Sequence, residues 1–526
     1  MTGLAISTLS THAYDVALRH AITDKVASRL AAKDPTLWGP DAEAEAGVRL
    51  SWIDLAKSSL PLVAEIETLR AELAAKGLDH VVLCGMGGSS LGPEVICHTA
   101  GVELTVLDSS QPDMVRSALS DRLERTIVVV SSKSGGTVET DSQRRAYEAA
   151  FTAAGLKPAD HIVIVTDPGS PLDNESIDAG YRVFHADPHV GGRYSALTAF
   201  GLVPSGLAGA PIGQLLDDAE QVAAIQSNDN ADNPGLRLGT LLGVANHAGV
   251  DKLVIADQTR NGIGDWIEQL VAESTGKDGK GILPVVVPFE NAVNFNPNNQ
   301  DALLVAIGSE TAPESLSGFS AAVSGGLGSL FLVWEDAVAI AGRAININPF
   351  DQPDVESAKQ ASRELLGGGG SGEEPVFSED GIDVFGTDRD TLADAILDLL
   401  IHSDLSQGYL AVQAYLDRHE YADFAGIREV LAQRTGRPVT FGWGPRFLHS
   451  TGQYHKGGPP NGIFLQITGD AHEDLPIPGR DFTFAEFIGA QADGDAKVLR
   501  GHGRPVLRLH LHDVAAALPR LREALA

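Results

Sequence analysis

The sequence predicts an α/β protein with mainly parallel sheets sandwiched between helices. Short runs rich in Val, Ile and Leu alternate with longer segments of helical spacing along most of the chain. Continuous apolar runs of this kind are typical of strands that are covered on both faces. Two glycine-rich segments each leave such a run and enter a helical pattern, as strand-to-helix loops do in this fold class.

The expected elements follow one another along the chain in two series. Residues 55–76 place Leu and Ile at spacings of three and four until Gly77, which predicts a helix that ends there. The first series of strands is expected at 80–85, 103–108, 125–132 and 161–167. After a helical pattern over 211–250, the second series is expected at 252–257, 282–287 and 302–308. Further strands are expected at 381–385, 438–442, 462–467 and 505–509.

A chain of 526 residues is long enough for two or three domains of about 100–200 residues each. The expected divisions are a helical extension over 1–50, a first sheet domain over 51–210, a helical connection over 211–250 and a second sheet domain over 251–526. Residues 367–378 are glycine-rich and then acidic, which predicts a linker or surface loop within the second domain. The strands after it either form a third domain or complete the second sheet.

Composition and charge exclude several classes of protein. Hydrophobic residues make up 43% of the chain, which is enough for a sizeable core. The formal net charge of −31 disfavours nucleic acid and anionic membranes as partners. Cys84 and Cys97 are the only cysteines, which argues against a disulfide framework and indicates a reducing compartment. The sequence does not open on a signal-peptide pattern, and no run approaches the ~18 apolar residues of a membrane span. We therefore expect a cytoplasmic protein.

The segment CGMGGSSLGPEV, residues 84–95, has the composition of an anion-binding loop. Backbone amides of residues 87–90 would surround an anion at the start of a helix, and the serine hydroxyls would add donors. An alternative is a dinucleotide site, because the segment nearly spells G-x-G-x-x-G and Asp108 ends the next strand, where a ribose-binding acid belongs. Ser90 breaks that pattern. A tight turn without a ligand is the third alternative.

A second loop, SSKSGGTVET at residues 131–140, strengthens the phosphate interpretation. It presents Ser132, Lys133, Ser134 and Thr137 around two glycines, a set of donors that suits a phosphate better than a dinucleotide. The alternative is a cluster of helix-capping residues, since Ser and Thr favour helix starts. Two such loops on consecutive parallel strands open at the same edge of the sheet, which favours a shared phosphate site.

Five motifs together resemble those of the phosphoglucose isomerase family. The two loops are similar to the family's G-I-G-G-S-x-L-G-P and S-K-S/T-x-x-T-x-E-T segments. Three further segments follow in order and resemble the family's G-G-R-[YF]-S, Q-x-x-x-E-S-x-G-K and N-P-F-D-Q-x-x-V-E-x-x-K segments, at residues 190–202, 268–281 and 348–359. The motifs span residues 84–359 and are jointly specific.

This resemblance implies a fold and an activity. The fold is two sugar-isomerase domains, each with a mainly parallel sheet sandwiched by helices. The activity is interconversion of glucose 6-phosphate and fructose 6-phosphate in glycolysis and gluconeogenesis, by ring opening and proton transfer through a cis-enediolate. The resemblance also implies no cofactor and a homodimer. Two alternatives are an isomerase that also accepts mannose 6-phosphate and a non-catalytic protein that binds sugar phosphates.

The same resemblance assigns roles to individual residues. Glu273 is the expected base that moves a proton between C1 and C2, and Arg193 is the cation beside the enediolate, where a guanidinium stays charged. Lys359 is expected to assist ring opening. The residues expected to bind the phosphate or the sugar are Gly88, Ser89, Ser132, Lys133, Ser134, Thr137, Gln269 and Gln352. Without the motifs, a solvated glutamate and a structural arginine are the simpler interpretations.

The ring-opening histidine departs from the usual family pattern. It normally lies between the glutamate motif and N-P-F-D-Q, but residues 290–345 contain no histidine. The segment RFLHSTGQY, residues 446–454, resembles the L-H-S-M-G-Q-Y segment of bacterial members, and this resemblance assigns the ring-opening role to His449. The displaced position of the segment resembles the bacterial branch related to transaldolase fusions. His455 is the alternative candidate. In the family this histidine comes from the neighbouring subunit of a dimer. Because the segment is displaced here, the histidine could instead come from the same chain as the rest of the site.

No metal site is expected. His510 and His512 alternate on an expected strand and so share a face, but no set of Cys, His or carboxylate residues with ligand spacing accompanies them. The sequence also has no match to the phosphate-binding pattern GxxxxGK[ST]. Proton transfer without a cofactor or a metal ion is therefore the expected mechanism.

Overall fold

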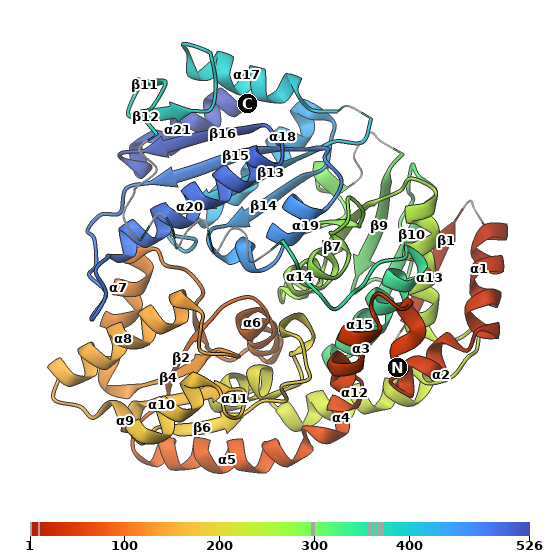
Figure 1. The fold of residues 1–526 in the computed structure, drawn as a ribbon, viewed down its shortest axis with the longest axis horizontal. Helices are drawn as coiled ribbons and strands as arrows, with labels where there is room; N and C mark the ends of the chain where they lie inside the picture. Colours follow the sequence, from red (N-terminus) through yellow and green to blue (C-terminus); the bar gives the residue numbers. More distant parts are fainter. Residues whose placement is uncertain are drawn as a thin grey trace.

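The computed structural model describes residues 3–8, 11–295, 300–354, 360, 364, 366, 373–404 and 406–526. The chain forms three sheets, and helices pack against each of them (Figure 1). The α/β class expected from the sequence is confirmed. Among the residues described, no helix is both long enough and apolar enough to cross a membrane.

The first sheet is entirely parallel. Its strands in spatial order are β3 (Thr105–Leu107), β2 (His80–Gly85), β4 (Thr126–Ser131), β5 (Ile162–Thr166) and β6 (Arg182–His185). One face packs on α5 (Leu60–Ala75), α6 (Gly88–Ala100) and α11 (Ala199–Ala208). The other face packs on α7 (Pro112–Ser120), α8 (Val138–Ala153) and α10 (Pro171–Ala179), and the short α9 (Pro158–His161) leads into β5. Both faces are therefore buried, which explains the continuous apolar runs of these strands.

The second sheet has four parallel strands and one antiparallel edge strand. Its order is β1 (Gly3–Thr8), β10 (Phe319–Ser324), β9 (Ala302–Ile307), β7 (Lys252–Asp257) and β8 (Leu283–Val287). One face packs on α12 (Ile212–Gln226), α13 (Pro234–His247), α14 (Ile263–Thr275) and α15 (Leu327–Ala344). The segment expected to form a helical connection thus holds α12 and α13.

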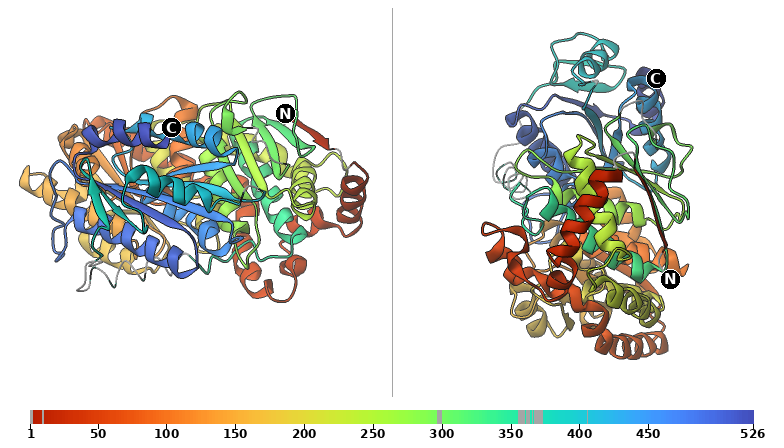
Figure 2. Two further views of the ribbon diagram at one scale, coloured as in Figure 1. Left: turned by 90° about the horizontal axis from the view of Figure 1, so that it is seen from above. Right: turned by 90° about the vertical axis from the view of Figure 1, so that its right-hand side faces the viewer.

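The sequence pattern had suggested that residues 1–50 are helical throughout. The structure shows that this segment also contains a strand. It contains α1 (Thr11–Thr23), α2 (Val26–Ala31) and α3 (Glu43–Arg49), followed by α4 (Leu55–Ser58). These helices lie at one end of the molecule, drawn in red in Figure 2. Strand β1 precedes them and pairs antiparallel with β10 along its whole length. An edge strand is defined by its hydrogen bonds to a distant partner, so its local sequence carries little indication of it.

The third sheet is built from the C-terminal part of the chain. Its order is β11 (Phe377–Glu379), β12 (Ile382–Phe385), β16 (Val506–Leu511), β15 (Gly462–Gly469), β13 (Tyr409–Tyr415) and β14 (Val439–Trp443). The last four are parallel to one another, while β12 runs antiparallel to β16 and β11 antiparallel to β12. One face packs on α17 (Leu392–Ile401), α18 (Ile427–Thr435) and α21 (Val514–Leu525), and the other on α19 (Gly452–Gly457) and α20 (Phe484–Gly501).

Residues 251–526, expected as one sheet domain, therefore contribute strands to two sheets. Of the two alternatives for the strands after the glycine-rich segment, the structure shows a separate sheet. Residues 367–372 of the expected linker lie outside the described residues. The sequence did not predict strand β13, because YLAVQAY holds only one β-branched residue, Val412. In the structure this strand lies inside the third sheet.

The second and third sheets share a buried contact. Residues of β7, β8 and β9 pack in one apolar cluster with residues of β13, β15 and α20. At its edge the buried Arg437, just before β14, donates Nη2–H to Oδ2 of Asp301, just before β9, at 2.7 Å. The Nζ of Lys252 lies 3.2 Å from the same carboxylate oxygen, and the Nε–H of Arg437 donates to the Gly408 carbonyl oxygen at 2.6 Å. This charged group fixes the register between the two sheets.

Replacing Arg437 by Met should lower the free energy of unfolding by about 3 kcal/mol, because Asp301 stays buried with less compensating charge. Arg434→Met is the matched control, since Arg434 is exposed and donates to carbonyl groups at the end of α21. That change should cost less than about 1 kcal/mol. Urea unfolding followed by circular dichroism measures both, and equal losses would contradict the interlocking role of Arg437.

Candidate active site

The two glycine-rich loops lie side by side at one edge of the first sheet. Gly85 at the end of β2 pairs with Ser131 at the end of β4, and the loops lead into α6 and α8. Gly87 and Gly135 have φ angles of 57° and 78°, which favour glycine. Both helices therefore begin at the same edge, where their first N–H groups can bind an anion.

Hydroxyl groups shape the second loop. The Oγ of Ser132 accepts a hydrogen bond from the N–H of Gly135 at 3.1 Å and lies 3.3 Å from the Oγ1 of Thr137. The Oγ of Ser134 accepts from the N–H of Gly136 at 3.2 Å. Thr137 is the N-cap of α8 but its side chain makes no capping bond. The hydroxyls hold the loop in one shape and leave the first turn of α8 without a side-chain cap.

The Lys133 side chain has a different environment from the one expected of a phosphate ligand. Its Nζ donates to the carbonyl oxygens of Pro188 and Val190, at 2.9 and 2.6 Å, and lies 3.6 Å from Asp167. Burial lowers the pKa of Lys133, and Asp167 opposes that effect. The ammonium group thus ties the second loop to the segment that follows β6.

Glycines allow the first loop to contact the arginine segment closely. A Cβ on Gly88 would lie 1.9 Å from the carbonyl oxygen of Gly192, the first residue of the 3₁₀ turn η4 (Gly192–Tyr194). A Cβ on Gly87 would lie 2.9 Å from both the Nε2 of Gln269 and the carbonyl oxygen of His449. Two elements from other parts of the chain therefore rest directly on the loop backbone.

Arg193 in η4 is the centre of this contact. Its side chain is only 3% exposed. Its Nε–H donates to the Oγ of Ser274 at 2.9 Å and its Nη1–H to the Oε1 of Gln352 at 3.0 Å. Its Nη2 donates to the carbonyl oxygens of Pro349 and Asp351, at 2.7 and 3.1 Å. The arginine thus joins α14 to the segment after α15, and it contacts Gln352, one of the residues that the motifs predicted for the site.

Glu273 lies beside this arginine. It is buried on α14, one turn after Gln269, and its Oε2 lies 3.6 Å from the Nη1 of Arg193. The pair places a cation directly beside the carboxylate that the motifs assign as the base. Gln269 donates its Nε2–H to the carbonyl oxygen of His449 at 2.8 Å. One face of α14 therefore contacts both Arg193 and the histidine segment.

His449 reaches the second loop within the same chain. It ends the 3₁₀ turn η7 (Arg446–His449), and its Nε2 lies 2.9 Å from the Oε1 of Glu139 in the first turn of α8. The same oxygen accepts from the Nε2–H of Gln491 at 2.8 Å, and Oε1 of Gln491 accepts from the hydroxyl of Ser110 at 2.5 Å. The sequence reasoning missed Glu139 and Gln491. Glu139 was present in the motif SKSGGTVET, whereas nothing local marks Gln491.

A buried ionic cluster fixes η7 to the first sheet. The guanidinium of Arg446 contacts the carboxylates of Glu94 on α6 and Asp108 after β3, at 2.6 and 2.5 Å. Arg418 contacts the same two carboxylates at 3.0 and 3.3 Å. Burial raises the pKa of Glu94, but the guanidinium groups of Arg446 and Arg418 outweigh it and hold that pKa well below its usual range. Asp108, considered above as a ribose ligand, is therefore a structural ion-pair partner.

Lys359 and His455 are the two other residues that the sequence analysis considered for ring opening. Lys359 lies outside the described residues. His455 is buried in the core of the third sheet, where it stacks on Tyr409 and packs edge-on against Phe464. Burial lowers the pKa of His455 to about 3, and its Nδ1 lies 3.0 Å from the Tyr409 hydroxyl. This is the environment of a neutral core histidine.

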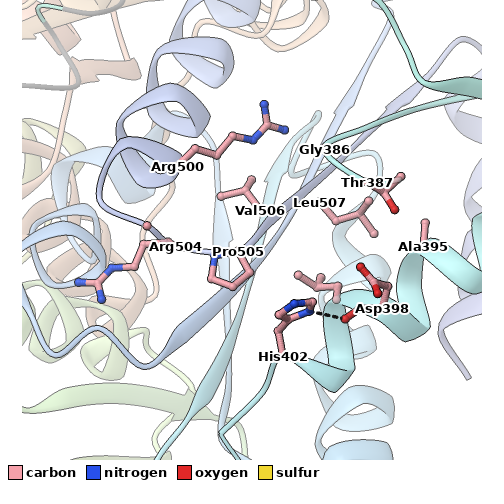
Figure 3. Close-up of a pocket in the computed structure, with 12 residues that line it drawn as sticks. Gly386, Thr387, Ala395, Asp398, His402, Arg500, Arg504, Pro505, Val506 and Leu507 are labelled. Carbon is pink, nitrogen blue, oxygen red and sulfur yellow. Dashed lines mark hydrogen bonds between the residues drawn. The ribbon is translucent and has the colours of Figure 1, made fainter. Parts of the chain in front are cut away.

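A hollow in the third sheet is separate from these residues (Figure 3). Its wall includes Asp398, His402 and Val506 and none of the predicted site residues. Arg504 lies at its edge, but Figure 3 shows its guanidinium pointing away from Asp398 and His402, and its Nη2 donates to the carbonyl oxygen of Gly458. Arg500 binds Glu373. The hollow therefore lacks the inward cations that a sugar phosphate needs.

Comparison with known proteins gives a consistent result. The family model described as "Phosphoglucose isomerase" matches residues 65–282, which include both loops, Arg193 and Glu273. The glucose-6-phosphate isomerase of Rippkaea orientalis is 28% identical over 358 residues, covering 57% of this chain and 68% of that protein. Residues 65–282 of this chain are therefore similar to the phosphoglucose isomerase family. The family model leaves out the segment that carries His449.

Other matches agree with this family assignment. The glucose-6-phosphate isomerase of Thermosynechococcus vestitus is 30% identical over 352 residues, covering 54% of this chain and 65% of that protein. A hypothetical protein of Thermus thermophilus has a solved structure with a TM-score of 0.59 and 25% identity, covering 69% of this chain and 100% of that one. The solved structure of the Chlamydia trachomatis glucose-6-phosphate isomerase shares the fold, with a TM-score of 0.51 and 21% identity. The match covers 62% of this chain and 74% of that one.

Replacing Gly88 by Ala should destabilise the protein by about 1–3 kcal/mol, because the new methyl group forces η4 away from the first turn of α6. The control is Gly489→Ala inside α20, where a Cβ meets nothing within 4 Å. That change should be neutral or stabilise by up to about 1 kcal/mol. Chemical denaturation of the two variants measures the difference. A neutral Gly88→Ala would show that η4 does not rest on the loop.

Proposed function

We propose that this chain is a member of the phosphoglucose isomerase family and interconverts glucose 6-phosphate and fructose 6-phosphate. The observation that carries the proposal is the convergence of two pairs, Glu273 with Arg193 and His449 with Glu139, beside two loops suited to a phosphate. The named relatives favour this activity over a non-catalytic sugar-phosphate-binding protein and over a dual isomerase that also uses mannose 6-phosphate.

The phosphate group is proposed to bind at the shared edge of β2 and β4. The N-termini of α6 and α8 favour negative charge there, and hydroxyls supply the remaining hydrogen bonds. The proposed ligands are the amide of Gly88 and the side chains of Ser89, Ser132, Ser134 and Thr137. Lys133 is proposed to act through the loop it anchors, because its ammonium group already binds the carbonyl oxygens of Pro188 and Val190.

Ring opening is proposed to use His449. Because a carboxylate only accepts, the Nε2 of His449 donates its hydrogen to Glu139, and Nδ1 keeps the lone pair. Nδ1 then takes the proton of the anomeric hydroxyl as the bond between C1 and the ring oxygen breaks, and the resulting imidazolium returns a proton to the ring oxygen, which becomes a hydroxyl. Gln491 holds Glu139 in place, and the family resemblance proposes that Lys359 assists at the same step.

Isomerisation is proposed to use Glu273. In the open-chain aldose its carboxylate removes the proton from C2, and the electron pair moves toward the C1 carbonyl to give an enediolate. Arg193 stabilises the negative oxygen without losing its own proton. The proton of the C2 hydroxyl passes to the C1 oxygen, the carboxylic acid delivers its proton to C1, and the C2 oxygen becomes the carbonyl of the ketose. Gln269 and Gln352 are proposed to orient the sugar hydroxyls.

A homodimer remains a proposal that rests on the family resemblance. In the described chain, His449 pairs with Glu139 of its own chain, and Gln269 binds the same segment. We therefore propose that each active site uses the histidine of its own chain, in contrast to the exchanged histidine of the family.

Replacing Glu273 by Gln should lower kcat by about 10²–10⁴-fold and change KM only a few-fold, because the amide keeps the shape but cannot accept the proton. Glu268→Gln, an equally conservative change on the same helix, serves as the control and should keep most of the activity. A coupled assay with fructose 6-phosphate measures both. Near-normal turnover in Glu273→Gln would contradict the proposed base.

His449→Ala should reduce kcat/KM for cyclic substrates by about 10²-fold or more, and far less for an open-chain analogue. His455→Phe should lower stability without changing that ratio, because His455 lies in the core. If the His455 variant alone changed the ratio, the assignment would pass to His455. Mixing Glu273→Gln with His449→Ala chains should restore no activity, whereas recovery would show that the histidine is exchanged between subunits.

A further inference from the structure

Two histidines and two aspartates meet where three strands of the third sheet end. His510 is in β16 and His512 follows that strand, so both lie on one side of it. Asp470 comes directly after the parallel neighbour β15, and Asp383 lies in the antiparallel neighbour β12, opposite His510. Because these residues are far apart in sequence, the strand pairing alone brings them together.

Backbone hydrogen bonds hold the group in position. The N–H of Asp470 donates to the carbonyl oxygen of Leu511, the residue between the two histidines, at 3.0 Å. The N–H of His512 donates to the carbonyl oxygen of Gly381 beside β12 at 3.1 Å. The side chains therefore project from backbone segments that are already hydrogen-bonded to one another. Bringing these side chains together costs little additional conformational entropy.

The distances within the group match those of a metal site. The Nε2 of His510 lies 3.1 Å from the Oδ1 of Asp470, and the Nδ1 of His512 lies 3.2 Å from the Oδ2. One ligand atom from each of the three residues lies within 4.8 Å of the others. A tetrahedral ion with bonds of about 2.0–2.1 Å has ligand atoms about 3.3 Å apart, so small side-chain movements would admit one.

The outer nitrogens of both rings are also held. The Nδ1 of His510 lies 2.9 Å from the Oγ1 of Thr468, and the Nε2 of His512 lies 3.0 Å from the Oδ2 of Asp383. Metal-binding histidines typically donate their second ring N–H to a carboxylate or another oxygen, which fixes the tautomer and aims the other nitrogen at the metal. Both rings here have that arrangement, with their inner nitrogens facing Asp470.

We propose that His510, His512 and Asp470 form a binding site for a divalent transition-metal ion of the zinc class, supported by Thr468 and Asp383. Two imidazoles and one carboxylate suit Zn²⁺, Co²⁺ or Ni²⁺, whereas Mg²⁺ and Ca²⁺ prefer oxygen ligands alone. The side chains of His512 and Asp470 are 52% and 55% exposed, so an ion can enter from solvent. A fourth position is left for water.

This group differs from the other cluster of potential ligands among the residues described. His80, Glu103 and Asp121 also lie within 4.8 Å of one another, but both carboxylates bind the guanidinium of Arg122. An arginine in that position already supplies the positive charge. No lysine or arginine contact to Asp470 is found among the described residues, so its charge is shared only with the two histidines.

The proposed site is independent of the proposed isomerase reaction. None of its residues belongs to the phosphate loops or to the pairs around Glu273 and His449. A bound ion would join the ends of β12, β15 and β16. It should therefore stabilise the third sheet and leave turnover unchanged.

Calorimetric titration of the metal-free full-length chain with Zn²⁺ alone tests the proposal. We expect one ion per chain, with a rise in Tm. His510→Gln, His512→Gln and Asp470→Asn should each weaken binding more than about 100-fold, and Asp383→Asn by about 10–100-fold. Isomerase activity and the metal-free Tm of each variant show that it has folded. Co²⁺ in place of Zn²⁺ should give the absorption bands of a tetrahedral site, and Mg²⁺ should not compete.

His472→Gln is the matched control, because His472 forms an exposed pair with Glu420 that lacks a second histidine. It should leave the affinity for Zn²⁺ unchanged. Undiminished binding in a His510→Gln/His512→Gln double variant would overturn the proposal. The absence of a saturable single site in the unmodified chain would also overturn it and would leave an ordinary network of histidine–aspartate hydrogen bonds.

Discussion

The candidate active site depends on the buried ionic cluster between the first and third sheets. Arg446 and Arg418 come from connections of the third sheet, whereas Glu94 lies on α6, which packs on the first sheet, and Asp108 follows β3 of that sheet. Removing one partner from such a group leaves a buried charge uncompensated, which typically costs about 3–5 kcal/mol. Because His449 lies three residues after Arg446, the position of this arginine determines whether the histidine reaches Glu139. The cluster therefore couples the packing of the sheets to the geometry of the site.

The charge of the chain places a second constraint on the site. With a net charge of −31, the long-range field repels an anionic sugar phosphate, so affinity has to come from local donors. Lys133 and Arg193 were expected to supply positive charge, yet both are tied to backbone carbonyl groups. Lys133 therefore holds two segments together beside the second loop, and Arg193 joins α14 to the segment after α15 while it also lies beside Glu273. In the proposed phosphate site, the helix N-termini and the loop hydroxyls would then carry more of the binding than the sequence had suggested.

Much of the fold followed from the sequence, because most strands are buried on both faces. Such strands carry continuous Val and Ile runs, and those at 80–85 and 252–257 begin and end where expected. The strands that were missed lack this composition. β1 is an edge strand paired with a distant partner, and β13 holds a single Val and no Ile, so in both the partner strand rather than local preference determines the conformation.

The sequence by itself determined the family resemblance, the two loops and the residues Glu273 and Arg193, because these lie in contiguous motifs whose chemistry is local. Only the tertiary structure decided which residues meet: His449 with Glu139 and Gln491, and His510 and His512 with Asp470 and Asp383. It also separated His449 from the buried His455, six residues away. The physical reason is that hydrogen bonds and ion pairs act over a few ångströms in space, whereas sequence patterns report only neighbours along the chain.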